Sequence, residues 1–226
     1  MLNAIQVQSQ SASGQFAPDG ADHFRQKADV QAYGAPRFVT QLCGPDAPQR
    51  AELEAFIREV FRRAHGATIR HFMPQLMSLR DAGGQLLAVC GLRNAADGGL
   101  FLETYLDAPV EQLISARASE DIAREDIVEI GNLAVAEPGM APVLLASVSK
   151  YLHDTGTQWA VFTAIPMLKN ALARLNMQLE TLGQAGIEHI PVEQRPEWGS
   201  YYDKQPQVMA VRRAARPHGV QRSMVA

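Results

Sequence analysis

The stretch IVEIGNLAVAEPGMAPVLLASVSKYLHDTG, residues 127–156, constrains the fold more than any other part of the sequence. It begins as a continuous apolar run typical of a buried strand, breaks at a Pro-Gly pair, and resumes with apolar residues at helical spacing. A second buried strand follows in the phrase QWAVFTAIPML. Two strands joined through a helix predict a βαβ unit with parallel strands and a right-handed connection.

Further strands and helices flank this unit. The segment APQRAELEAFIREVFRRAHG is the strongest helix pattern, because its apolar residues recur at helical spacing before the stop signal Gly66. The other expected elements are a strand at 37–42, a hairpin around the DAGG turn at 81–84, a strand near 100 that becomes a helix at Pro109, the helix KNALARLNMQ, and short strands as far as 213. This order predicts an α+β (α/β) fold with a central mixed sheet.

Length and composition favour one globular domain. A chain of 226 residues with 46% hydrophobic content can bury a substantial core. Residues 1–35 are rich in Gln, Ser, Ala and Gly without periodicity, so we expect a flexible leader, a domain at 36–213 and a flexible tail at 214–226. No run resembles a signal peptide or approaches the roughly 20 apolar residues that span a bilayer, so we expect a cytoplasmic protein without integral membrane association.

Charge and cysteine content argue against several functional classes. The formal net charge of -3 gives no overall basic surface for nucleic acid. Cys43 and Cys90 match no metal-ligand spacing, and two reduced thiols are the simplest interpretation. We therefore expect neither a nucleic-acid partner nor a metal site, and the sequence leaves the oligomeric state open.

Several long phrases carry a resemblance to a known family. RHFMPQLMSLRDAGGQLLAVCGLRNA, LFLETYLDAPVEQLI, VEIGNLAV, WAVFTAIPMLKNALARL and WGSYYDKQPQVMAV resemble the thermostable-hemolysin family, a group with the GNAT (N-acetyltransferase) fold, over about residues 37–212. A fainter similarity is to acyl-homoserine-lactone synthases, which take their acyl group from acyl carrier protein. The resemblance implies a mostly antiparallel mixed sheet with a splayed βαβ unit and flanking helices.

The resemblance also implies a donor site at the turn after the 127–135 strand. In GNAT enzymes this turn presents backbone N–H groups to the donor in the pattern Gln/Arg-x-x-Gly-x-Gly/Ala, and a family-wide Asn contacts the pantetheine arm. Here Ala136 stands where the Gln or Arg is expected. A helix start still favours an anion or a thioester oxygen. The implied donor-binding residues are Val135, Gly139, Met140, Ala141 and Asn170. An ordinary strand-to-helix turn, with Asn170 as a cap or core residue, is the alternative.

The catalytic candidates are Glu129, Asn132 and Glu103. An amine must lose a proton before it attacks a thioester, and Glu129 is a carboxylate placed mid-strand between apolar residues. Asn132 is a candidate to position the acceptor or polarise the carbonyl. In a regular strand these two side chains face opposite sides, but a bulge near Gly131 would re-aim one of them. The alternatives are ion pairs: Glu129 with Arg70, Arg80 or Arg93, and Glu103 with Arg93 or Arg117.

The candidate substrate-binding residues lie in three separate phrases. His71 is a pocket or base candidate, or alternatively a core or hinge histidine, and Arg93 lies near the end of the predicted hairpin. The aromatic residues of WGSYYDKQP are candidates to shape a pocket, or alternatively to pack in the core. No tyrosine lies between Tyr151 and Tyr201, so the acid that many GNAT enzymes use is missing from its usual place. The substrate-binding set is His71, Arg93, Trp198, Tyr201 and Tyr202.

These observations lead to one main hypothesis and two alternatives. The main hypothesis is an N-acyltransferase that moves an acyl group to a small amine from the thioester of acyl-CoA or of acyl carrier protein, the latter being a partner protein. The second is membrane lysis, as the family's name implies, although no long basic amphipathic helix is visible. The third is a catalytically silent GNAT scaffold that serves in binding or assembly.

Overall fold

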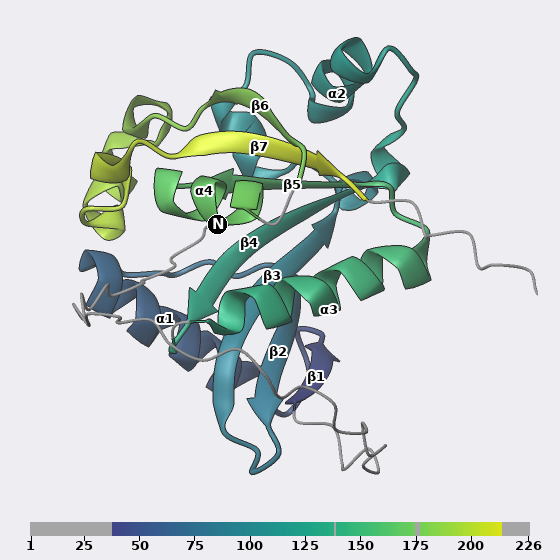
Figure 1. Ribbon diagram of the computed structural model, residues 1–226. Helices are drawn as coiled ribbons and strands as arrows, with labels where there is room; N and C mark the ends of the chain where they lie inside the picture. The colour runs from purple at the N-terminus through teal and green to yellow at the C-terminus, as the bar shows by residue number, and fades with distance from the viewer. Residues whose placement is uncertain (1–37, 138, 175–176, 214–226) are drawn as a thin grey trace, which may run out of the picture.

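The computed structural model describes residues 38–137, 139–174 and 177–213, and its centre is one seven-stranded sheet (Figure 1). The strand order is β1-β2-β3-β4-β5-β7-β6, and only the β4–β5 pair is parallel. The strands are β1 (Phe38–Cys43), β2 (Gln75–Asp81), β3 (Leu86–Asn94), β4 (Ile127–Val135), β5 (Trp159–Ala164), β6 (Leu179–Gln184) and β7 (Gln207–Arg212). The predicted mixed, mostly antiparallel sheet with a βαβ unit is confirmed. The expected leader and tail lie outside the described residues.

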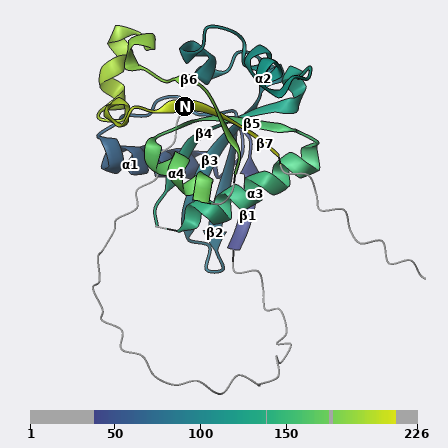
Figure 2. The same cartoon turned by 45° about the horizontal axis from the view of Figure 1, so that its top comes forward.

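Helices cover both faces of this sheet (Figures 1 and 2). The described part of the chain contains four α-helices, which are α1 (Arg50–His65), α2 (Val110–Ala118), α3 (Met140–Thr155) and α4 (Pro166–Arg174). α3 and α4 pack on the face that carries Ile130 and Phe162. α2 lies against Trp159 and α1 beside Arg93, which are both on the other face. The sheet therefore separates two layers of helices, one on each face.

α1 follows its sequence pattern closely. Leu53, Ile57 and Phe61 are buried in one stripe, as an amphipathic helix requires. Gly66 ends the helix with φ 66°, and its N–H donates to the Arg62 carbonyl. A left-handed residue at this position favours glycine because it has no Cβ. The predicted helix and its stop signal are both confirmed.

Two expected elements differ from the structure. The strand expected near residue 100 is wrong, because Phe101–Tyr105 forms a 3₁₀ helix, η2, whose N–H groups bond to carboxylates instead of to a strand. The helix expected to begin at Lys169 begins at Pro166, where proline suits the first helical position. In both places the backbone conformation is determined by side-chain hydrogen bonds or by proline geometry. The spacing of hydrophobic residues does not record either effect.

Arg124 ties the connection between β3 and β4 together. It begins the short 3₁₀ helix η3 (Arg124–Asp126), and its guanidinium bonds to Glu103 at 2.7 Å, to Glu111 at 2.6 Å and to the Ala95 carbonyl at 2.9 Å. These partners lie before, inside and after η2. One side chain therefore joins three segments of the β3–β4 connection to the start of β4.

The C-terminal end of α1 docks tightly on the loop at Gly199. A Cβ at this position would lie 2.0 Å from the His65 carbonyl oxygen, and Gly199 has φ 50°. Ser200 N–H donates to the same carbonyl at 2.9 Å. The His65 ring is buried and packs edge-on against Tyr201 at 5.3 Å between ring centroids. Burial, with a smaller effect from the Lys204 charge, lowers the pKa of His65 below its ordinary value.

We expect replacement of Arg124 by Gln to lower the free energy of unfolding by about 2–3 kcal/mol, because it leaves two half-buried carboxylates without their cation. Arg62→Gln is the matched control, since its ion pair with Glu59 is exposed and screened by solvent, and we expect a clearly smaller loss of stability from it. Urea unfolding of the two variants measures the difference. Equal costs would contradict the proposed role of Arg124.

We expect stability to fall as the pH is lowered from 7.5 to 5.5. The folded-state pKa of His65 is lowered, so below the unfolded value near 6.5 only the unfolded chain takes up the proton. The slope should not exceed about 1.4 kcal/mol per pH unit for one proton. Urea unfolding at three pH values checks this, and His65→Gln should flatten the dependence. A His65→Gln variant as pH-sensitive as the parent protein would overturn the assignment.

Candidate active site

β4 and β5 separate part of the way along their length (Figure 1). They pair from Ile127 with Trp159 as far as Ile130 with Phe162, and β4 then continues to Val135 with β3 as its ladder partner. The β5 ladder gives residues 131–135 no partner, so their backbone groups on that side face the gap between the strands. A splayed strand pair of this kind was expected from the family resemblance.

A β-bulge lies where the strands begin to separate. The register between β3 and β4 shifts between Val89 and Gly91, which leaves one extra residue in β4. Asn132 takes the strained conformation there, with φ 48°, and it is fully buried. Its Oδ1 accepts from Met73 N–H at 2.8 Å, and its Nδ2 donates to the His71 carbonyl at 3.4 Å. These bonds help to stabilise a left-handed residue, which Asn adopts more readily than most.

The bulge places Glu129 and Asn132 on the same face of the sheet. Glu129 is directly opposite Arg93, and Gly91 shares the Arg93 face because it is two residues away. A Cβ on Gly91 would lie 3.1 Å from Asn132 Oδ1 and 2.5 Å from Met73 Cβ, so both side chains reach that same face. The expected re-aiming of one side chain by a bulge is therefore present, and the strained residue is Asn132 and not Gly131.

Glu129 is a buried carboxylate held by backbone donors. Its Oε2 accepts from Phe101 N–H at 3.2 Å and its Oε1 from Leu102 N–H at 3.1 Å, while the side chain is 2% exposed. Of the arginines considered as partners, Arg70 pairs with Glu197, Arg80 with Glu52, and Arg93 donates to the Gly99 carbonyl. Glu129 thus fixes the first turn of η2 to β4.

Glu103 occupies a different environment. It accepts from Arg124, from Leu100 N–H at 2.8 Å and from Val110 N–H at 3.0 Å. Burial raises its pKa, but the hydrogen bonds from Arg124 and the two backbone donors outweigh burial and leave the pKa lowered. A carboxylate with a lowered pKa is a weaker proton acceptor. The arrangement favours the ion-pair role for Glu103, with Arg124 in place of the expected Arg93 or Arg117.

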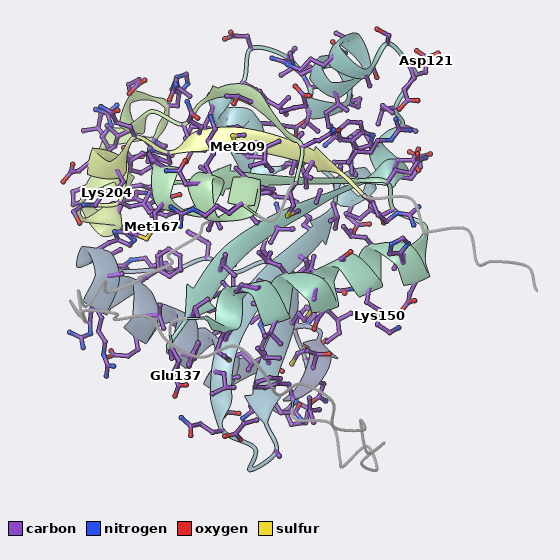
Figure 3. The ribbon with its side chains drawn as sticks, viewed as in Figure 1. Asp121, Glu137, Lys150, Met167, Lys204 and Met209 are labelled. Carbon is purple, nitrogen blue, oxygen red and sulfur yellow. The ribbon has the colours of Figure 1, made fainter. Side chains whose placement is uncertain are left out.

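The turn after β4 forms the start of α3. Val135 is the last strand residue, Gly139 has φ 89°, and the helix begins at Met140. Ala141 is buried and Ala136 is exposed, with its N–H bonded to the Leu87 carbonyl at 3.0 Å. Figure 3 shows Glu137 beside this helix start and Lys150 further along α3, directed away from the sheet. The turn therefore combines a helix N-terminus with an acidic neighbour.

Asn170 lies on the exposed side of α4, in the middle of the helix. It is four residues beyond Pro166, so it neither opens the helix nor belongs to the core. The expected cap or core alternative for Asn170 is therefore wrong. Contact with a donor stays a prediction for this residue.

An apolar pocket of about 70 Å³ lies beneath the splayed strands on the α3 and α4 side. Ile130 and Leu133 of β4 and Phe162 of β5 form its floor at the point where the strands part. The sequence analysis missed these residues as site candidates, because an apolar strand residue looks the same whether it lines a pocket or fills a core. The other lining residues are Leu145, Val148, Ser149, Leu152, Ala160, Leu168, Leu172, Met177, Val211 and Arg212.

A larger cavity of about 520 Å³ lies on the Glu129 face. His71 and Arg93, two of the expected substrate-binding residues, line it together with the missed residues Arg50 and Phe101. Arg50 is 43 positions from Arg93 in sequence, and no local pattern connects them. The cavity adjoins Glu129, because that carboxylate bonds to the N–H of Phe101 in the cavity wall.

The expected aromatic residues Trp198, Tyr201 and Tyr202 are buried together behind this cavity. The Tyr202 hydroxyl bonds to that of Tyr105, a residue that the sequence analysis missed, and Trp198 packs on Phe101 at 5.9 Å between centroids. Burial raises the pKa of Tyr202 to about 12, despite the lowering effect of its bond to Tyr105, and burial raises that of Tyr201 further. Their place behind Phe101 favours the packing alternative, with the rings supporting the cavity wall.

Residues 38–137, 139–174 and 177–213 contain no group of three or more His, Cys, Asp or Glu side chains arranged to hold a metal ion. None of the helices in those ranges has the length and hydrophobicity needed to cross a membrane.

Comparison with solved structures identifies the fold of the chain. The chain resembles FeeM, an N-acyl amino acid synthase from uncultured soil microbes, with a TM-score of 0.54 and 15% identity over 79% of this chain and 91% of that chain. It resembles the acyl-homoserine-lactone synthase LasI with a TM-score of 0.53 and 12% identity over the same shares. Curated protein sequences contain no match. At these identities the likenesses show the fold alone, which is GNAT-like.

The sequence itself matches the family model described as thermostable hemolysin over residues 43–216. This match spans most of the chain and includes the bulged strand, the turn before α3 and the aromatic segment. The protein therefore belongs to the thermostable hemolysin family.

Proposed function

We propose that the protein is an N-acyltransferase, which moves an acyl group from a pantetheine thioester to a small amine. The observation that carries the proposal is the gap between β4 and β5, which has an apolar pocket on one face and Glu129 with a polar cavity on the other. The acyl chain of a thioester in this gap would lie in the apolar pocket, and its reacting carbonyl would lie toward Glu129 and the polar cavity. Two proteins of the same fold, FeeM and LasI, are synthases of N-acylated products.

The donor would lie along the unpaired edge of β4. Backbone groups of residues 131–135 that face the gap can bond to the amides of a pantetheine arm, as an added strand would. The N-terminus of α3 then offers N–H groups and a positive dipole end to a phosphate. The apolar pocket of about 70 Å³ suits a short acyl chain.

Acyl carrier protein is the donor that we favour over acyl-CoA. Both have a phosphopantetheine arm, but CoA adds a second phosphate in its pyrophosphate and a further charged nucleotide. Ala136 gives no cation at the turn, and Glu137 adds a negative charge to it. Like charges at this position disfavour the more highly charged donor.

The chemical step needs one base. In our proposal Glu129 takes one proton from the acceptor ammonium and the amine nitrogen attacks the thioester carbon. The zwitterionic tetrahedral intermediate then loses a second nitrogen proton to solvent and expels the thiolate to leave a neutral amide. The pKa of Tyr202, raised by burial to about 12, lies well above that of a thiol near 8.5, so proton transfer from Tyr202 to the thiolate would be uphill. The thiolate therefore leaves unprotonated and takes its proton from solvent.

Replacement of Glu129 by Gln should lower kcat by about 10²–10⁴-fold, because the variant has no proton acceptor at this position. The measurement is mass-spectrometric detection of N-acylated products from a panel of amines with acyl carrier protein and acyl-CoA thioesters. Glu111→Gln is the control, because it removes a carboxylate from the Arg124 ion pair and leaves β4 unchanged. Thermal unfolding verifies that both variants are folded. Unchanged turnover in Glu129→Gln would contradict the role of Glu129, and no product with any donor or amine would favour a non-catalytic scaffold.

Replacement of Ala136 by Arg should lower the KM for acyl-CoA by about tenfold, because a charge-assisted bond to the pyrophosphate becomes available. We expect a much smaller effect with acyl carrier protein as donor, since it carries a single phosphate on the arm. Ala146→Arg is the control; it adds the same charge at an exposed position inside α3, away from the turn. Steady-state kinetics with both donors measures the effect, and an equal response to the two substitutions would show that position 136 does not contact the donor.

A further inference from the structure

The cavity on the Glu129 face has the size and the composition of a small-molecule site. Its volume of about 520 Å³ lies in the range of ligand pockets. Three separate segments form its wall: the first turns of α1, the residues just before β2, and the end of β3 with the loop into η2. The lining residues are Arg50, Glu54, Arg70, His71, Phe72, Met73, Arg93, Gly99, Leu100 and Phe101.

The arginines of this cavity differ in how their charge is satisfied. Arg50 pairs with Glu54 at 2.8 Å and donates to the carbonyls of Met73 and Pro74. Arg70 pairs with Glu197 at 2.8 Å. Arg93 is half-buried and donates to the Gly99 carbonyl at 3.1 Å; among the described residues no carboxylate pairs with it. Arg93 therefore retains guanidinium donors for a ligand.

Arg93 and Glu129 form a fixed cross-strand pair. They are directly opposite each other in β3 and β4, which places their Cβ atoms about 4.5–5.5 Å apart on one face. The two groups do not neutralise each other, because Glu129 accepts from the N–H groups of Phe101 and Leu102. A ligand with a carboxylate on Arg93 and an amine toward Glu129 would need only a short spacer between these groups.

We propose that this cavity binds the acceptor and that the acceptor is a small amine with a carboxylate close to its amino group, held through Arg93. This proposal names the acceptor class of the proposed acyl transfer. It rests on that proposed function for the statement that the bound amine becomes acylated. A planar guanidinium matches a carboxylate in a bidentate arrangement. His71 lines the same cavity and would border the bound acceptor.

Direct binding tests the proposal without any acyl donor. The probes are the common L-amino acids, their carboxamides and O-phosphoethanolamine, each titrated against the full chain by isothermal titration calorimetry. We expect at least one amino acid to bind at least tenfold more tightly than its carboxamide. Equal affinity for acid and amide, no binding of any acid, or binding of the phosphorylated amine alone would overturn the proposal.

The Arg93 variants assign the effect to this residue. Arg93→Gln should weaken binding of the acid by about 10–100-fold and leave the carboxamide unaffected, while Arg93→Lys should restore part of the loss. Arg63→Gln is the control, since it removes an equal charge from the exposed side of α1. An acid that binds Arg93→Gln as tightly as the parent protein would overturn the assignment.

A turnover assay separates this proposal from the proposed function. If acids bind in an Arg93-dependent way but no thioester donor acylates them, the binding site stands and the acyl transfer is wrong. If acylation occurs with acids and carboxamides at equal kcat/KM, acyl transfer stands and the acceptor class proposed for this cavity is wrong. Acylation of acids with an increased KM in Arg93→Gln and a nearly unchanged kcat supports both.

Discussion

The extra residue at Asn132 is the constraint on which the rest of the site depends. A left-handed residue in the middle of a buried strand is unfavourable, and two hydrogen bonds to the segment before β2 offset its cost. The same bonds hold residues 71–73 against the sheet, where they become one wall of the polar cavity. The bulge also coincides with the end of regular β4–β5 pairing. The bulge thus occurs together with three features of the site: the gap between β4 and β5, the common face of Glu129 and Asn132, and the polar cavity.

Glu129 contributes to structure as well as to the proposed chemistry. A buried carboxylate needs hydrogen-bond donors, and the N–H groups of Phe101 and Leu102 supply them. The inserted segment between β3 and β4 is held at its other side by Arg124, which bonds to Glu103 and Glu111. The segment is therefore attached at two points. Trp198 packs on Phe101 of this segment and the Tyr202 hydroxyl bonds to that of its Tyr105, so the two C-terminal rings support the wall that contains Phe101.

Much of the fold follows from local sequence pattern. The apolar runs of β4 and β5 and the helical spacing of α3 identify the βαβ unit, and the DAGG turn identifies the hairpin of β2 and β3. The fold name and the strand gap came from family resemblance, since periodicity cannot tell a splayed pair from a regular one. The prediction of a strand at 101–105 is wrong because hydrogen bonds from backbone N–H groups to the carboxylates of Glu103 and Glu129 determine the conformation there. The alternation of hydrophobic residues does not record such bonds.

The sequence predicts only part of the candidate site. Glu129 and Asn132 stand out as polar residues in an apolar strand, and Gly131 pointed to a bulge. Arg50, Arg124 and Tyr105 did not stand out, because their roles depend on contacts between segments that are far apart in the chain.

The apolar pocket and the polar cavity lie on opposite faces of one sheet, and none of the residues placed by the structure lines both of them. A mutation in the apolar pocket changes the surface offered to one molecule and leaves the wall around the other untouched. If the acyl chain and the acceptor occupy these pockets as proposed, substitutions can alter the preference for each molecule separately, without the trade-off that a shared wall would impose. Members of such a lineage would be free to diversify in two independent directions while the strand between the pockets stays the same.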